Sequence, residues 1–357
     1  MHTLLINRIA RGLQDADKEP LLPENTIQIR GTRGSSFDRQ LVDWVRRKLS
    51  MAVWVMEDQQ GSLTTPLDPV FGVFAFRAIL RGFFIGASFL PGADLLLEKK
   101  HLSLSVIGYY TSALHLVNSF SALHGHVMLS PIAGQPVVEL ADDLVGTKMA
   151  SGGTVHRGGS AGYSQAPKGL QAACAILTKD GHWVFEGRNR SHSVIWRELR
   201  QLMTESRLVP RWLDRFCRNS AYPKMKVDEE RYLNEGLDML IKARHQAVYN
   251  GFGMDDFSFD ILINREPVDV NIAARALNYR TLAYGILNDV LKETTTLFKD
   301  IEQQCPHELE RLLPQLCTMV YTPPFDLKRD FADTIRSEID QVPGCNDWLA
   351  KVLVTAV

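Results

Sequence analysis

Residues 270–301 read VNIAARALNYRTLAYGILNDVLKETTTLFKDI, and apolar side chains return there every three or four positions. This spacing is typical of one face of a long helix, which we expect to begin near Val270. The apolar positions of that face are Ile272, Ala276, Tyr279, Ala283, Ile286, Leu287, Val290 and Leu291. A helix with such a stripe cannot bury it alone, so the sequence predicts partner helices and a bundle.

Two further segments have the same spacing and supply those partners. One is residues 102–123, which read LSLSVIGYYTSALHLVNSFSAL, and the other is residues 229–249, which end in ARHQAVY. Asn250 and Gly251 follow, and Gly commonly closes a helix in the left-handed conformation. The sequence therefore predicts three packed helices.

The pattern of small and aromatic residues in these helices resembles that of the HEPN superfamily of helical domains. The matching residues are Tyr109, Tyr110, Ala113 and His115, then Arg244, Ala247 and Tyr249, then Ala273, Ala274 and Ala276. The insert between the helices is similar to that of the YaaC-like branch. The resemblance implies a mainly α fold, an HEPN-like bundle with a loop-rich insert that contains a small β-hairpin. It also implies a bacterial or phage-related protein of RNA-targeting, toxin–antitoxin or antiviral defence.

The chain divides into three expected parts. Residues 1–100 form an N-terminal helical extension, residues 101–302 the HEPN-like core with an inserted loop and hairpin near 128–187, and residues 303–357 a C-terminal helical tail. Asp180-Gly181 stands between two strand-like runs, which predicts a hairpin over residues 175–185.

Composition indicates a soluble globular protein. The 357 residues are 45% hydrophobic and 23% charged, with a net charge of −1, which argues against a chain that coats nucleic acid over its whole surface. The five Cys are scattered without a C-x-x-C pair, so we expect neither disulfides nor a structural zinc site. We expect a cytoplasmic protein, since the N-terminus lacks the pattern of a signal peptide. We also expect no cofactor and no metal.

The most apolar part of the chain, residues 70–97, contains Arg77 and Arg81 one helical turn apart. Each would cost about 2.5 to 3.5 kcal/mol at the centre of a membrane-spanning helix. We therefore predict a buried helix of a soluble protein, with both arginines at one polar edge, and no membrane span.

Many HEPN proteins are ribonucleases whose signature is an Arg followed, after four to six residues, by a His. No Arg of this sequence has a His at that interval, and Tyr249 stands where the His would follow Arg244. Tyr, with a pKa of about 10, is a poor replacement in a proton transfer near neutral pH. The candidate catalytic residues are Arg244, His245 and Tyr249. The favoured interpretation is a binding or scaffolding module in which Arg244 is structural; the alternative is a divergent, metal-independent endoribonuclease that cleaves RNA.

Residues 188–226 carry ten Lys or Arg and three acids, a balance of +7, with aromatic residues between them. Such a segment suits RNA or single-stranded DNA, because the charges follow the backbone and the rings stack on bases. It suits an acidic protein equally well, including residues 228–238 of this chain. The predicted nucleic-acid-binding residues are Arg188, Arg190, Trp196, Arg197, Arg200 and Arg211. We expect a protein partner or a homodimer, and RNA or single-stranded nucleic acid.

Two weaker patterns favour structural roles. Residues 158–162 match G-x-S-x-G, but they lack the strand before and the helix after that a nucleophile elbow needs. His124 and His126 flank Gly125 at a helix end, where bonds to helix carbonyls are commoner than metal ligation.

Overall fold

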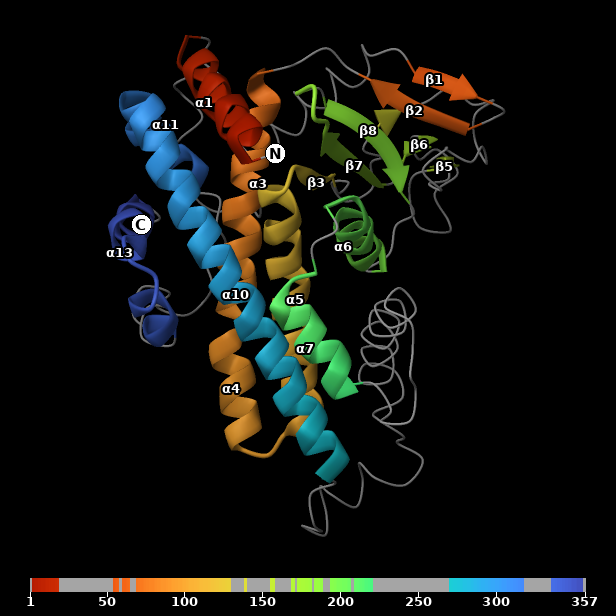
Figure 1. Cartoon of the computed structure of the whole chain (residues 1–357), viewed down its shortest axis with the longest axis vertical. Coiled ribbons are helices and arrows are strands. Elements are labelled where there is room, and N and C mark those ends of the chain that lie inside the picture. Colours follow the sequence, from red (N-terminus) through yellow and green to blue (C-terminus); the bar gives the residue numbers. More distant parts are fainter. Residues whose placement is uncertain are drawn as a thin grey trace.

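The structure, a computed structural model, describes thirteen parts of the chain, and within them the fold is mainly α (Figure 1). These parts are residues 2–18, 54–57, 60–64, 69–129, 138–139, 155–157, 168–170, 172–181, 183–188, 193–206, 209–220, 270–317 and 335–355.

Three long helices run side by side along the molecule: α3 (Pro69–Ser88), α5 (Leu102–Leu123) and α10 (Val270–Gln304) (Figure 1). Helix α5 packs against both α3 and α10, and α1 (His2–Lys18) packs on α3. A side chain on Gly82 would place its Cβ 2.9 Å from the backbone of Ser119, so this glycine allows α3 and α5 to approach closely. The predicted helices over 102–123 and 270–301 are confirmed, whereas 229–249 lies outside the described residues.

The apolar stretch forms α3 and α4 (Leu90–Glu98). Phe71–Glu98 is the one stretch of the described chain long and apolar enough to span a membrane, and 72% of its apolar window is buried inside the molecule. That burial is typical of a core helix. The two arginines do not share a polar edge as predicted, because Arg77 is buried and Arg81 is exposed. Burial, followed by the nearby charge of Arg81, lowers the pKa of Arg77 to about 9.

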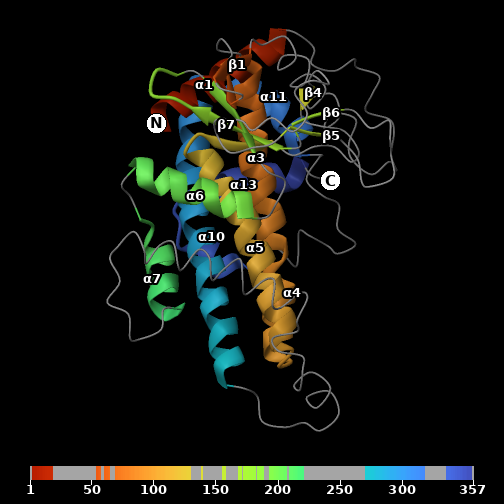
Figure 2. The same ribbon diagram turned by 90° about the vertical axis from the view of Figure 1, so that its right-hand side faces the viewer.

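A five-stranded antiparallel sheet lies at the same end of the molecule as α1, with α4 at the opposite end (Figure 2). Its order is β1 (Trp54–Glu57), β2 (Gln60–Thr64), β8 (Trp183–Arg188), β7 (Ala172–Leu177) and β3 (His126–Leu129). A second sheet has the order β4 (Val138–Glu139), β6 (Lys168–Leu170) and β5 (Val155–Arg157).

The predicted hairpin is confirmed, and in it Ala175 pairs with Phe185 and Leu177 with Trp183. Gly181 has φ of 78° and its amide donates to the carbonyl of Thr178, as the Asp-Gly turn requires. The β structure is larger than a single hairpin, because β3 pairs with β7 and β2 with β8. Strands β1 and β2 lie in a part of the sequence for which no strand was predicted.

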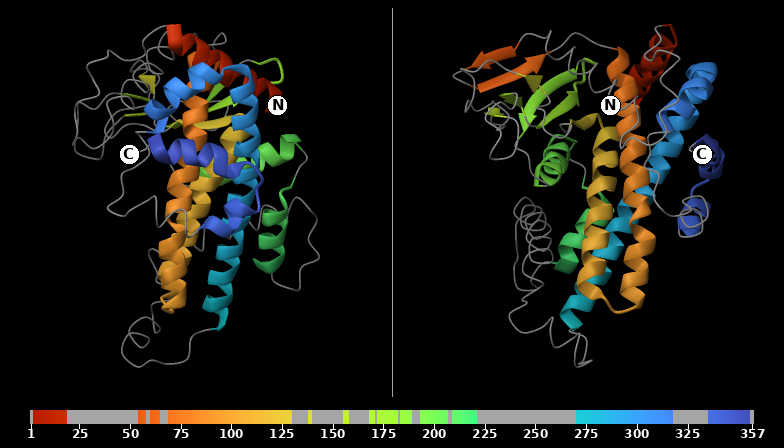
Figure 3. Two further views of the ribbon diagram at one scale, coloured as in Figure 1. Left: turned by 90° about the vertical axis from the view of Figure 1, so that its left-hand side faces the viewer. Right: turned by 180° about the vertical axis from the view of Figure 1, so that it is seen from behind.

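The remaining helices surround the bundle. Helix α6 (Ser193–Ser206) contacts α5 and β3, and α7 (Arg211–Ser220) contacts α10. The break between α6 and α7 falls at Pro210, as predicted. Helices α11 (Pro306–Cys317) and α13 (Cys345–Thr355) follow α10, and α13 lies on the side away from the sheets (Figure 3). There the rings of Phe298 and Trp348 stack with centroids 4.7 Å apart.

Candidate functional site

The predicted catalytic residues Arg244, His245 and Tyr249 lie outside the described residues, so the structure does not test them. Arg190 also lies outside. Arg188 ends β8, and Arg197 lies within α6.

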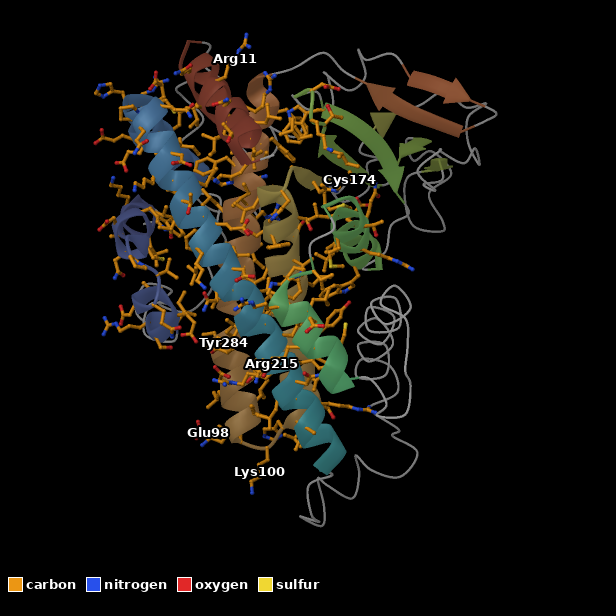
Figure 4. The ribbon with its side chains drawn as sticks, in the orientation of Figure 1. Arg11, Glu98, Lys100, Cys174, Arg215 and Tyr284 are labelled. Carbon is orange, nitrogen blue, oxygen red and sulfur yellow. The ribbon has the colours of Figure 1, made fainter. Side chains whose placement is uncertain are left out.

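Helices α6 and α7 carry the described part of the basic segment. Arg200 on α6 and Arg211 and Arg215 on α7 are exposed, and Figure 4 labels Arg215. Asp214 lies on α7 between Arg211 and Arg215 and is half-buried. We call Arg200, Arg211 and Arg215 the basic face.

The aromatic residues between these arginines belong to the core. Trp196 is 0% exposed, and its indole Nε1 donates a hydrogen bond of 3.0 Å to the hydroxyl of Tyr110. Trp212 meets Phe120 edge-on, and Phe216 meets Tyr279 in the same way. These rings occupy the apolar faces of amphipathic helices, so the ring of Trp196 is closed to a base. This corrects its prediction as a nucleic-acid contact.

A pocket of about 320 Å³ lies where the end of α5 meets α10 and the start of α1. Its lining combines three basic side chains, one carboxyl group and two smaller residues: His2, Leu123, His124, Lys292, Glu293 and Thr296. A concave site with several convergent polar groups is the usual setting for ligand binding or catalysis.

His124 is placed by the end of α5. Gly125 has φ of 86°, which turns the chain out of the helix and into β3. The Nδ1 atom of His124 lies 3.0 Å from the carbonyl of Phe120, as predicted for a helix-end histidine. Donation from Nδ1 leaves the lone pair of the neutral ring on Nε2, so Nε2 is the basic nitrogen.

Glu293, on α10, brings a carboxyl group to this imidazole, with 3.6 Å between its Oε2 and Nδ1 of His124. Burial lowers the pKa of His124. Burial, followed by the nearby charge of Asp289, raises the pKa of Glu293 to about 7. Near neutral pH the pocket therefore holds a neutral imidazole and a carboxyl group that is partly protonated, a base and an acid at one place.

Asp289 connects the pocket with the basic face. It lies one turn before Glu293 on α10, and burial raises its pKa. The positive charges of Lys292 and Arg211 act on it in the opposite direction, as does His124. Since both Arg211 and His124 act on the charge of Asp289, the Arg211 end of the basic face lies near the pocket.

A second polar cluster has a structural role. Asp94 on α4 accepts hydrogen bonds from the hydroxyl of Tyr109 at 2.5 Å, from Nε of Arg280 at 2.8 Å and from the hydroxyl of Tyr284. Burial and then the bond to Asp94 raise the pKa of both phenols. The cluster joins α4, α5 and α10, and all three donors are bound to the one carboxylate of Asp94. This arrangement favours a structural role over a reactive site.

These features define a mainly α protein with an antiparallel sheet at one end, a basic face on α6 and α7, and an acid–base pocket beside it. The chain matches no protein-family model, no curated protein and no solved structure in the comparisons made with each. Its function is therefore argued from its own residues. The sequence drew attention to His124 but not to Glu293, which looks like an ordinary polar position of a long helix.

Proposed function

We propose that this chain is a cytoplasmic, HEPN-like binding module that holds RNA or another single-stranded nucleic acid along its basic face. The observation that carries the proposal is the exposure of Arg200, Arg211 and Arg215 within a segment whose charge balance is +7. In this proposal the module belongs to a bacterial or phage-related RNA-targeting, toxin–antitoxin or antiviral defence system, as the HEPN resemblance implies, and works with a protein partner or a second copy.

The burial of the aromatic rings determines what kind of binding the face supports. Arginine side chains pair with phosphate oxygens through two parallel hydrogen bonds. Without exposed rings to stack on bases, the described face contacts the backbone and carries little sequence information. The binding we propose is therefore strong at low salt and nearly independent of base sequence.

A second function, a divergent and metal-independent ribonuclease, is favoured by the pocket. His124 would accept the 2′-hydroxyl proton through Nε2, and Glu293, in its protonated form, would donate a proton to the leaving 5′ oxygen. Lys292 and the neighbouring Arg211 would stabilise the negative charge of the phosphorane. This candidate differs from the expectation for the family because it uses His124 rather than Arg244.

Binding of a fluorescent single-stranded RNA, followed by anisotropy, tests the first proposal. The variant R200E/R211E/R215E reverses the basic face. Its matched control, K99E/K179E/K299E, reverses three exposed lysines on other surfaces and changes the net charge equally. We expect the first variant to bind at least about tenfold more weakly at low salt and the control to bind almost as the wild type does. Equal affinities for the two variants would overturn the proposal.

Cleavage of the same RNA, followed on a gel, tests the second function, the ribonuclease. If the pocket is catalytic, His124→Asn and Glu293→Gln abolish cleavage while RNA affinity is kept. If the wild-type protein leaves RNA intact, the second function is excluded and the binding proposal stands.

A further inference from the structure

Three side chains that commonly bind transition metals meet in the core, and none of them lines the pocket. They are His126 on β3, Cys174 on β7 and Glu198 on α6. Their ligand atoms all lie within 4.8 Å of one another. The exposed fractions of the residues are 3%, 0% and 2%. Each comes from a different element, and the shortest separation along the sequence is 24 residues, from 174 to 198.

The fold explains why they converge. In the antiparallel pair of β3 and β7, His126 is opposite Ile176, and Cys174 lies two residues from Ile176. Residues two apart on a strand share a face, so His126 and Cys174 are diagonal neighbours on one side of the sheet. Helix α6 contacts β3 and brings Glu198 to the same place, and Figure 4 shows Cys174 beside α6.

The distances suit a small cation. Nδ1 of His126 is 3.7 Å from Oε2 of Glu198, which is longer than a hydrogen bond. Two ligands on a tetrahedral zinc ion, with bonds of about 2.0 to 2.2 Å, stand about 3.4 Å apart. A contraction of a few tenths of an ångström would therefore bring both atoms to bonding distance.

The chemistry of the three groups selects the metal. The carboxylate of Glu198 and the thiolate of Cys174 would bring two negative charges to the site, which match the charge of a divalent cation. A thiolate and an imidazole favour zinc over magnesium or calcium, which prefer oxygen ligands. We propose that His126, Cys174 and Glu198 bind a zinc ion, with a water molecule as the fourth ligand. As the Zn–S bond forms, the thiol of Cys174 loses its proton to solvent.

This zinc site would fasten the sheet to α6, which carries Arg200 of the basic face. It does not depend on the proposed RNA binding, because its three ligands are buried core residues. No metal was expected from the sequence, because its Cys and His lack the short spacings of known zinc motifs. Ligands that are this far apart in the chain form no such motif.

The test is a titration of metal-free protein with Co²⁺, which takes zinc sites and absorbs light. Ligation by Cys174 predicts a thiolate-to-cobalt charge-transfer band in the near ultraviolet that saturates at one equivalent and disappears on addition of Zn²⁺. Zinc should also raise the melting temperature. We expect Cys174→Ser and Glu198→Gln to bind cobalt at least about 100-fold more weakly.

The matched control is Cys217→Ser, which changes another buried cysteine, on α7, and should leave the band unchanged. If Cys174→Ser fails to fold, the wild-type titration and Glu198→Gln decide the question. Folded wild-type protein that gives no cobalt band and no rise in melting temperature with Zn²⁺ would overturn the site. So would a band of wild-type intensity in Cys174→Ser.

Discussion

Oε2 of Glu293 lies 3.6 Å from Nδ1 of His124, so a carboxyl group from α10 meets an imidazole from the end of α5. Nothing in either local sequence joins the two, which are separated by 168 intervening residues. Their meeting depends on the packing of α5 against α10, and it places an acid and a base on the wall of one pocket.

The raised pKa of Glu293 predicts a pH-dependent stability. The folded protein keeps a proton on this group up to about pH 7, whereas the unfolded chain releases it near the ordinary pKa of 4.5. Stability is therefore lost as the pH rises between these two values. Glu293→Gln removes that loss. We expect the variant to match the wild type near pH 4.5 and to be more stable at pH 8 by about 1 kcal/mol, a value reduced for solvent screening, since the side chain is 34% exposed.

Thermal melts of both proteins from pH 4.5 to pH 8 measure this difference. The gap between their melting temperatures should widen with pH and then level off above pH 7. A gap that stays constant over the whole range would show that Glu293 titrates at its ordinary pKa.

The Asp94 cluster predicts a large loss of stability from one substitution. Asp94→Ala leaves the buried hydroxyl of Tyr109 without its acceptor, and it also removes the partner of Arg280. We expect a cost of about 2 to 4 kcal/mol, because an unsatisfied buried donor loses its hydration without compensation. Asp94→Asn keeps an acceptor and should cost about half as much. Urea denaturation measures both, and a change below about 0.5 kcal/mol in Asp94→Ala would contradict a fastening role.

Because Trp196 is buried, substituting it should lower the stability of the protein but not its affinity for RNA. Trp196→Phe keeps an aromatic ring but removes the hydrogen bond to Tyr110 and some volume, so we expect a loss of about 1 to 3 kcal/mol in the free energy of unfolding. Affinity for RNA, measured at a temperature where the variant is folded, should stay within about twofold of the wild type. A large loss of affinity in folded Trp196→Phe would show that the ring contacts bases after all.

The sequence predicted the elements whose signals are local. Periodic apolar residues located α5 and α10, and Asp180-Gly181 located the turn between β7 and β8. Pro210 located the break between α6 and α7. Strand β2 was missed because Gln60–Thr64, which reads QGSLT, has no alternating pattern. One of its two partners, β8, is also more than 100 residues away.

The sites were harder to predict for a related reason. A charge count finds basic residues, but it does not tell which aromatic neighbours face inward, and Trp196 was misjudged on that ground. Glu198 and Glu293 resemble surface residues of amphipathic helices until the packing of α6 and α10 is known. Burial and pairing are properties of the tertiary structure, and they give these carboxyl groups their chemistry.

The salt dependence of RNA binding tests the central claim most directly. For single-stranded nucleic acid, the slope of log K against log salt is about −0.7 for each phosphate contact. Replacing Arg200, Arg211 and Arg215 by Ala removes three proposed contacts, so the slope should become less steep by about 2. The account predicts this change together with an unaltered circular dichroism spectrum. A folded triple variant whose slope equals that of the wild type would contradict it.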